Sequence, residues 1–177
     1  MRVFFACLFK DFDSSLIYEE IINARAFFPM GNYTLKENLH VTVEFIGDVD
    51  ETTLSELKTI LHSFSYRKFV LEPVKLDYFS NKSSKQILFL GLKRNEQLFE
   101  CNKLLRSYLR NCNISFQDKP YISHITLARN VKDIKNLDTI NLQNQGSKFL
   151  MTKLSLMESL RIDDKLVYRE IDYQLFE

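Results

Sequence analysis

Two short stretches of the sequence each place a threonine two residues after a histidine, inside an apolar, strand-like run. The first is NLHVTVEFIG, with His40 and Thr42, and the second is YISHITLAR, with His124 and Thr126. Alternate side chains of a strand lie on the same face, so each pair is expected to project from one side of its strand. Two imidazoles facing each other can divide acid and base roles near neutral pH, and two hydroxyls can bind an anion between them.

An isolated H-x-T is more often a half-exposed strand residue that bonds a neighbouring carbonyl. Here two of the three histidines in the chain occur in the pattern, which makes coincidence the weaker explanation. The third, His62, falls in a helical stretch opposite an apolar stripe and is expected on the solvent side. That stripe consists of Leu54, Leu57, Leu61 and Phe64.

Other chemistries find little support in the sequence. Two suitable histidines without a third ligand at helpful spacing do not make a zinc site. The glycines are scattered, so a phosphate-cradling loop is not expected, and there is no G-x-S-x-G elbow. The cysteines lack an adjacent basic partner that would mark a nucleophile. We therefore expect neither a metal nor a cofactor.

Composition is that of an ordinary globular protein, with 45% hydrophobic and 27% charged residues in 177. A net charge of +1 argues against a protein that coats nucleic acid, but not against a basic patch in a cleft. Three widely spaced cysteines fit a reducing cytosol. The apolar run at the start of the sequence ends at Lys10 and Asp11, which makes a signal peptide the weaker interpretation. No apolar stretch of the sequence approaches the roughly 18 residues needed to span a membrane. We expect a soluble, cytoplasmic monomer.

The element order can be read from hydrophobic periodicity and from turn and cap residues. Asp13 and Ser14 are expected to cap the first helix and Asp50 the second. The order of strand, helix and histidine strand occurs twice, which predicts two similar, successive α+β halves. Strands are expected at 3–9, 39–46, 69–79, 86–92, 122–128, 153–160 and 167–176, and helices at 14–28, 51–64 and 95–110. The connections SNKSSK and RIDDK are expected as a loop and a turn.

NLHVTVEFIG and SHITLAR resemble the paired HxTx signatures of the two-histidine phosphoesterases, above all the bacterial and archaeal RNA 2′,3′-cyclic phosphodiesterases of the LigT or ThpR type. MRVFFACLF, KQILFLGL and the closing LSLMESLRIDDKLVYREIDYQLFE resemble strands of the same family, so the resemblance covers nearly the whole chain. It implies a bilobal α+β fold, with two pseudo-symmetric antiparallel-sheet lobes, helices outside and a central cleft. Residues 1–177 would form this single two-lobed domain.

The resemblance also implies a reaction, the metal-independent hydrolysis of 2′,3′-cyclic phosphate ends of RNA or nucleotides to 2′-phosphates. His40 would be the proton donor and His124 the proton acceptor, and Thr42 and Thr126 would bind the non-bridging oxygens. Arg129 could add a charge-assisted contact. Its odd offset from His124 places it on the opposite face, unless the strand bends or ends near Ala128. An obligate protein partner is not implied.

Three residues depart from the family pattern. Glu44 stands where a basic residue is usual, Ser123 where proline usually precedes the second histidine, and Tyr33 where tryptophan is common. Strand parity puts Glu44 on the face of His40, where a carboxylate would repel a phosphate. We expect it at the rim of the cleft, paired with a lysine.

Several functions stay open on the sequence alone. A two-histidine enzyme could act on another substrate, such as a 2′,5′-linked oligonucleotide or a cyclic ADP-ribose phosphate. A non-catalytic module that binds RNA ends is a further reading, although a binder has no need of both imidazoles. A globular domain with coincidental motifs is the least specific one. The physiological RNA, and whether ligation occurs in reverse, are not decided by these residues.

Overall fold

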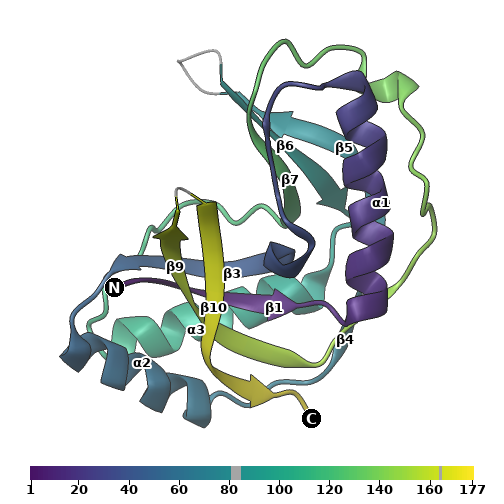
Figure 1. Ribbon diagram of the computed structural model, residues 1–177. Helices are drawn as coiled ribbons and strands as arrows, with labels where there is room; N and C mark the ends of the chain where they lie inside the picture. Colours follow the sequence, from purple (N-terminus) through teal and green to yellow (C-terminus); the bar gives the residue numbers. More distant parts are fainter. Residues whose placement is uncertain (81–84, 164) are drawn as a thin grey trace.

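The computed structural model describes residues 1–80, 85–163 and 165–177 (Figure 1). Within them the strands are β1 Arg2–Leu8, β2 Asn32–Tyr33, β3 His40–Asp48, β4 Phe69–Leu71, β5 Pro73–Phe79, β6 Gln86–Leu92, β7 His124–Val131, β8 Phe149–Met151, β9 Lys153–Ile162 and β10 Lys165–Leu175. The helices are α1 Asp11–Phe27, α2 Glu51–Ser63 and α3 Glu96–Asn111, with 3-10 turns η1 Lys36–Asn38 and η2 Leu137–Thr139.

The strands form two four-stranded antiparallel sheets, one in each lobe. The first sheet has the order β10-β9-β1-β3, and the second has the order β2-β7-β6-β5. A short ladder of β4 and β8 makes a third sheet. In Figure 1 the second sheet lies above the first, with β3 and β7 at the sides that approach each other. The predicted α+β fold with two antiparallel-sheet lobes is confirmed, and each four-stranded sheet carries one histidine strand.

The helices are exchanged between the lobes. Helix α1 follows β1 of the first sheet, yet it packs against β7 of the second. Helix α3 follows β6 of the second sheet and packs against β3 of the first. Each unit of strand, helix and histidine strand therefore keeps both strands in one sheet and sends its helix to the other. This exchange ties the two sheets together.

The prediction of two successive halves is wrong. Strand β9, from the end of the chain, pairs with β1 in the first sheet, and β10 pairs with β9 at the edge of that sheet. Strand β2, from the beginning, pairs with β7 in the second. The strand expected at 69–79 is also divided, because β4 pairs with β8 whereas β5 pairs with β6. Local patterns predict that a strand exists, but not the partner it finds along the chain.

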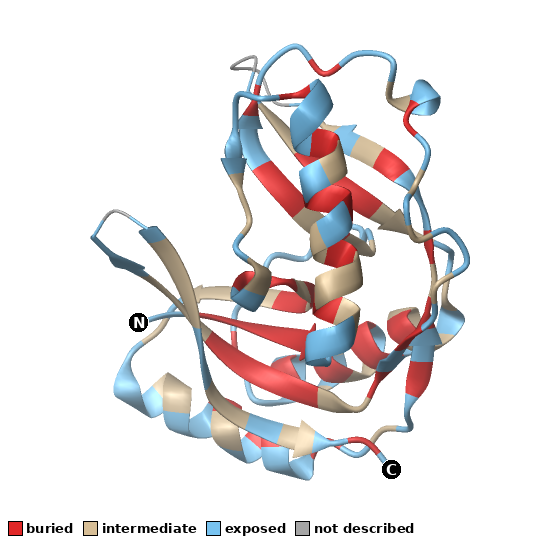
Figure 2. Cartoon of the chain, turned by 45° about the vertical axis from the view of Figure 1, so that its right-hand side comes forward, coloured by how far each residue is buried: buried red, intermediate tan, exposed pale blue. Residues whose placement is uncertain are grey.

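One large hydrophobic core runs through both sheets and under the helices. It includes fully buried side chains from four elements: Phe5 of β1, Leu61 of α2, Leu105 of α3 and Ile125 of β7. Figure 2 shows buried residues on the inner side of α1 and along the strands of both sheets. Burial of each such side chain contributes about 1.5–3 kcal/mol. In the part of the chain that the structure describes, the helices are too short or too polar to cross a bilayer.

Helix starts were predicted with mixed success. Asp50 caps α2 as expected, since its Oδ1 accepts a hydrogen bond from the Thr53 N–H at 2.8 Å. The predicted cap of α1 is wrong, because this helix begins at Asp11, earlier than expected, and its N-cap position is Lys10. Asp11 and Asp13 instead lie in the first turn, where they favour the helix dipole. The predicted SNKSSK loop and RIDDK turn include residues 81–84 and 164, which lie outside the described residues.

Candidate active site

His40 and Thr42 lie half-buried on one face of β3, as strand parity predicted, while Val41 and Val43 are fully buried. The His40 Nδ1 lies 2.7 Å from the Asn38 carbonyl oxygen. Because a carbonyl only accepts, Nδ1 carries the proton of the neutral ring. Nε2 is then the acceptor, and the Thr42 hydroxyl, 3.1 Å away, donates to it.

His124 repeats this arrangement on β7. Its Nδ1 lies 2.8 Å from the Ile122 carbonyl oxygen, so its neutral ring has the same tautomer, with Nε2 as the acceptor. In both motifs the orienting carbonyl belongs to the residue two positions before the histidine. For an isolated H-x-T, a hydrogen bond to a neighbouring carbonyl was expected of a histidine with a purely structural role. Here it fixes the tautomer that leaves Nε2 available for proton transfer.

Aromatic rings enclose both imidazoles. The centroids of Phe4 and Tyr168 each lie 5.0 Å from that of His40. Those of Phe79 and Phe89 lie 5.0 and 5.3 Å from that of His124. These rings displace water, and loss of hydration disfavours the imidazolium form.

Burial is accordingly the main cause that lowers the pKa of both histidines. It lowers the pKa of His40 to about 4, while the bond to the Asn38 carbonyl acts in the opposite direction. It also lowers the pKa of His124. The positive charge of Arg129 lowers both values further, and the charge of His124 adds to the effect on His40. In the empty protein at neutral pH both rings are therefore neutral.

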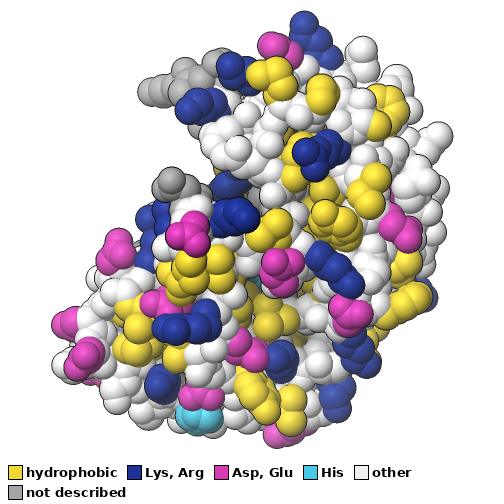
Figure 3. Space-filling view, in the orientation of Figure 1, with side chains coloured by type: hydrophobic (Ala, Val, Ile, Leu, Met, Phe, Trp, Pro, Cys, Tyr) yellow, Lys and Arg dark blue, Asp and Glu magenta, His cyan; other side chains and the backbone are white. Residues whose placement is uncertain are grey.

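Three adjoining cavities bring the five expected site residues together. A cavity of about 420 Å³ is lined in part by His40, Thr42 and Arg129. A second, of about 370 Å³, shares His40 and Arg129 and adds Thr126. A third, of about 260 Å³, joins Thr42 to His124. We call their union the cleft. In Figure 3 the surface is hollowed between the lobes, and Lys and Arg side chains gather on both sides of the hollow.

A β-bulge follows the first motif and changes the direction of the side chains after it. Thr42 pairs with Ala6 and Glu44 pairs with Phe5, so Val43 is the extra residue of β3. Val43 and Glu44 consequently both lie on the core side. Phe45 returns to the cleft, where the Arg2 guanidinium lies 5.0 Å from the centroid of its ring.

The second motif has a bulge at the same position. Thr126 pairs with Phe89 and Ala128 with Leu88, which leaves Leu127 as the extra residue. Regular alternation along β7 would place Ala128 on the face of His124 and Thr126, and this expectation is wrong, because Ala128 is fully buried in the core. The bulge bends β7 and places Arg129 in the cleft. A bend near Ala128 was the condition under which Arg129 could reach the site despite its odd offset from His124.

The expected position of Glu44 is wrong for the same reason. Its side chain is 5% exposed and points to the core side of β3, not to the face of His40. The expected lysine partner is an arginine, since Nε of Arg106 on α3 donates to Glu44 Oε2. Asn102 Nδ2 donates to the same oxygen at 3.1 Å. Glu44 and Arg106 both line the third cavity, where the guanidinium offsets the charge of the carboxylate.

Residues from the beginning and the end of the chain also line the cleft, and sequence reasoning missed them. They are Arg2, Phe4, Arg161, Lys165 and Tyr168. With Arg129, the two larger cavities have four cationic lining residues, and within the described chain their lining contains no carboxylate. Only the tertiary fold brings these residues to the motifs. A local sequence signal for them does not exist.

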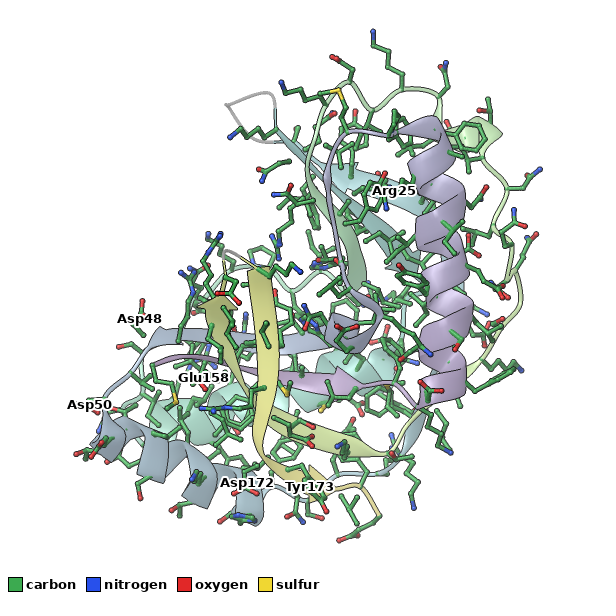
Figure 4. All side chains as sticks on the ribbon, viewed as in Figure 1. Arg25, Asp48, Asp50, Glu158, Asp172 and Tyr173 are labelled. Atoms are coloured by element: carbon green, nitrogen blue, oxygen red, sulfur yellow. The ribbon has the colours of Figure 1, made fainter. Side chains whose placement is uncertain are left out.

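Tyr33, at the position where tryptophan is common, also lines the second cavity. Its hydroxyl donates to the Phe28 carbonyl at 2.6 Å, and the Arg25 guanidinium, labelled in Figure 4, lies 5.7 Å from its ring centroid. The hydroxyl of the smaller ring thus fastens it to the backbone. Among the described residues there is no group of three or more His, Cys, Asp or Glu side chains placed to hold a metal ion.

His62 is on the surface, as predicted, with 56% of its side chain exposed. Its Nε2 lies 2.9 Å from Oδ2 of Asp172, at the end of β10 far from the upper sheet (Figure 4). We expect His62→Ala to leave kcat unchanged and to alter the free energy of unfolding by no more than about 0.5 kcal/mol, because exposed polar contacts contribute little. Steady-state assays and denaturant titration measure both quantities. A hundredfold loss of turnover would place His62 in the active site.

Residues 19–89 match the family of LigT-like phosphoesterases. An RNA 2′,3′-cyclic phosphodiesterase of Methanocaldococcus jannaschii is 34% identical over 125 residues, which cover 68% of this chain and 68% of the relative. The chain belongs to the LigT-like phosphoesterase family. A Thermotoga maritima member named RNA 2′,3′-cyclic phosphodiesterase is 31% identical over 96 residues, which cover 53% of this chain and 51% of that protein. The match thus spans about half the length of this second relative.

The fold of the family is found over almost the full chain. The crystal structure of E. coli LigT in apo form superposes with a TM-score of 0.78 at 23% identity, covering 99% of this chain and 96% of that one. This structure shows the fold, and the matches in sequence confirm the two-histidine phosphoesterase family suggested by the motifs.

Proposed function

We propose that this LigT-like phosphoesterase hydrolyses 2′,3′-cyclic phosphate ends of RNA or nucleotides to 2′-phosphates, without a metal. One observation carries the proposal. Two imidazoles from opposite sheets, each with its proton on Nδ1 and an unprotonated Nε2, border one cleft together with two hydroxyls and Arg129. The names of the curated relatives support the same reaction. We assign His124 as the proton acceptor and His40 as the proton donor.

The reaction needs an acid and a base on opposite sides of the phosphorus. A water molecule attacks the phosphorus and gives its proton to Nε2 of His124. The bond from phosphorus to the 3′ oxygen breaks, and this oxygen takes a proton from Nε2 of His40. Displacement at phosphorus is roughly in line, so groups projecting from two facing strands suit it. Each positioned proton transfer contributes about 10²–10⁴-fold.

The protonation states follow from the surroundings of each ring. In the empty cleft burial keeps His40 neutral, with a pKa of about 4. A bound phosphate brings a negative charge next to His40 and raises the pKa of this imidazole. His40 therefore becomes protonated, and able to act as the acid, when substrate is present. His124 must stay neutral to act as the base, and the charge of Arg129 favours that form.

The remaining cleft residues bind charge. Thr42 and Thr126 donate hydrogen bonds to the non-bridging oxygens, whose charge grows in the transition state. Arg129 adds a charge-assisted contact. E. coli LigT, which has the same fold, has been crystallised with phosphate and with 3′-AMP. In our proposal the protein acts as a cytoplasmic monomer and needs no protein partner.

A substrate panel tests the function. Purified protein with a metal chelator is incubated with an RNA oligonucleotide ending in a 2′,3′-cyclic phosphate, a cyclic mononucleotide, a 2′,5′-linked dinucleotide and a cyclic ADP-ribose phosphate. We expect hydrolysis of the cyclic ends and a 2′-phosphate product, identified by ³¹P NMR. Turnover of the dinucleotide or the ADP-ribose phosphate alone would change the substrate. Binding without turnover would make the protein an RNA-end-binding module.

A further inference from the structure

The bulge after the first motif is bound from behind by α3. Asn102 Nδ2 donates to the Val43 carbonyl at 2.6 Å and to Glu44 Oε2 at 3.1 Å. Arg106 Nε donates to the same carboxylate oxygen. The side chains of Glu44 and Arg106 are 5% and 13% exposed, so this ion pair is largely shielded from water. A shielded pair of this kind holds one geometry more firmly than a surface pair.

The other nitrogens of the Arg106 guanidinium bind the segment that leads to the second motif. Nη2 donates to the Lys119 carbonyl at 3.0 Å and to the Gln117 carbonyl at 3.4 Å, and Nη1 donates to Asp118 Oδ1 at 3.4 Å. Just beyond, the Tyr121 hydroxyl donates to the Thr42 carbonyl at 2.8 Å. Segment 117–121 is therefore fastened to β3, the strand of His40, at two points.

Segment 117–121 leads directly to the carbonyl that orients the second histidine. Ile122 follows Tyr121 directly, and its carbonyl oxygen accepts the hydrogen bond from His124 Nδ1. The first histidine has a different anchor. Its orienting carbonyl belongs to Asn38, whose side chain bonds the backbone of β10 at the Leu166 carbonyl and the Tyr168 N–H, at 2.8 and 3.1 Å.

We propose that Glu44 and Arg106 form a positioning pair, which sets the orientation of His124 from the strand that carries His40. The carboxylate fixes the plane of the guanidinium, and the guanidinium holds the carbonyls of residues 117 and 119. Five donors in a rigid fork can satisfy a carboxylate and two carbonyls at once, which a lysine ammonium cannot do in the same geometry. The expected change in kcat rests on the proposed function. The expected change in the orientation of the His124 ring does not.

The test removes both charges together in Glu44→Gln/Arg106→Gln, because removal of one alone leaves an unpaired buried charge. The tautomers of His40 and His124 are read from long-range ¹H–¹⁵N NMR spectra of the substrate-free protein. We expect His124 to lose its preference for the Nδ1–H form, while His40 keeps it. We also expect kcat for a cyclic phosphate to fall by about 10–100-fold with KM within about threefold, since a misplaced base slows the chemical step more than binding.

The matched control is Arg110→Gln. Arg110 lies one turn further along α3 and shares the contact of Arg106 with Asp118, at 3.3 Å, but among the described residues it binds neither Glu44 nor the carbonyls of the segment. It should leave the spectra of both histidines and kcat unchanged. A double variant that is folded and merely less stable, with a wild-type His124 spectrum and wild-type kcat, overturns the proposal.

A second variant covers failure of the double variant to fold. Arg106→Lys keeps the charge and should still disturb His124 and not His40; an undisturbed His124 in this variant also overturns the proposal. The spectra separate this inference from the proposed function. If the wild-type protein shows no turnover but the variants shift His124 alone, the positioning pair stands and the hydrolase assignment fails.

Discussion

Replacement of either motif histidine by alanine is expected to lower kcat for a 2′,3′-cyclic phosphate by at least about 100-fold. His40→Ala removes the acid for the leaving 3′ oxygen, and His124→Ala removes the base for the attacking water. Affinity for a non-hydrolysable phosphate analogue should stay within severalfold, because hydroxyls and Arg129 carry most of the binding. Initial rates give kcat, and isothermal titration calorimetry gives the affinity.

Threonine variants supply the contrast for this prediction. Thr42→Val and Thr126→Val remove hydrogen bonds to the phosphate. They should therefore weaken binding of the phosphate analogue more than the histidine variants do. The double change should weaken it most. His62→Ala serves as the surface control. Histidine variants that lose binding but retain the turnover rate would show a recognition site in place of a catalyst.

Arg129→Gln is expected to lower kcat/KM by about 10–100-fold, the usual worth of a charge-assisted hydrogen bond to an anion. It should also move the pH profile. The charge of Arg129 lowers the pKa of both histidines, so its removal raises both values. The base then becomes neutral only at higher pH, and the acid keeps its proton to higher pH. Both limbs of the profile should therefore shift in the alkaline direction.

The matched control for Arg129 is Arg94→Gln. Arg94 is 76% exposed and pairs with Glu96, at the start of α3 and outside the lining of the cleft. It should change neither kcat/KM nor the pH profile. Unchanged limbs in Arg129→Gln, with only a general loss of activity, would mean that Arg129 does not act on the histidines through its charge.

Strand periodicity predicted the site up to the threonine of each motif and failed just beyond it. His40 and Thr42, and likewise His124 and Thr126, share a face because two-residue alternation holds until the bulge. The inserted residue then reverses the alternation, which misplaced Glu44 and Ala128 and left Arg129 uncertain. A bulge depends on which residues of the partner strand pair and on groups such as Asn102 that bind its free carbonyl. Neither is visible in a local pattern.

The positions of the strands and helices could be predicted from the sequence, but their assignment to the two sheets could not. Most strands and all three helices lie close to the positions expected from periodicity and caps. Their assignment to lobes was wrong, because β9 returns across most of the chain to pair with β1, and β10 joins the same sheet beside β9. The same return brings Arg161, Lys165 and Tyr168 to the cleft. Their roles follow from tertiary pairing alone.

The pH dependence of kcat/KM for a cyclic phosphate tests the central claim most directly, when it is measured for the wild-type protein and for both histidine variants. The account predicts a bell-shaped wild-type profile whose limbs belong to the coupled pair of imidazoles. His124→Ala should lose the rise on the acidic side, because the base that must be deprotonated is gone. His40→Ala should lose the fall on the alkaline side, because the acid that must stay protonated is gone. A bell that persists with the same limbs in both variants would contradict acid–base catalysis by these two histidines.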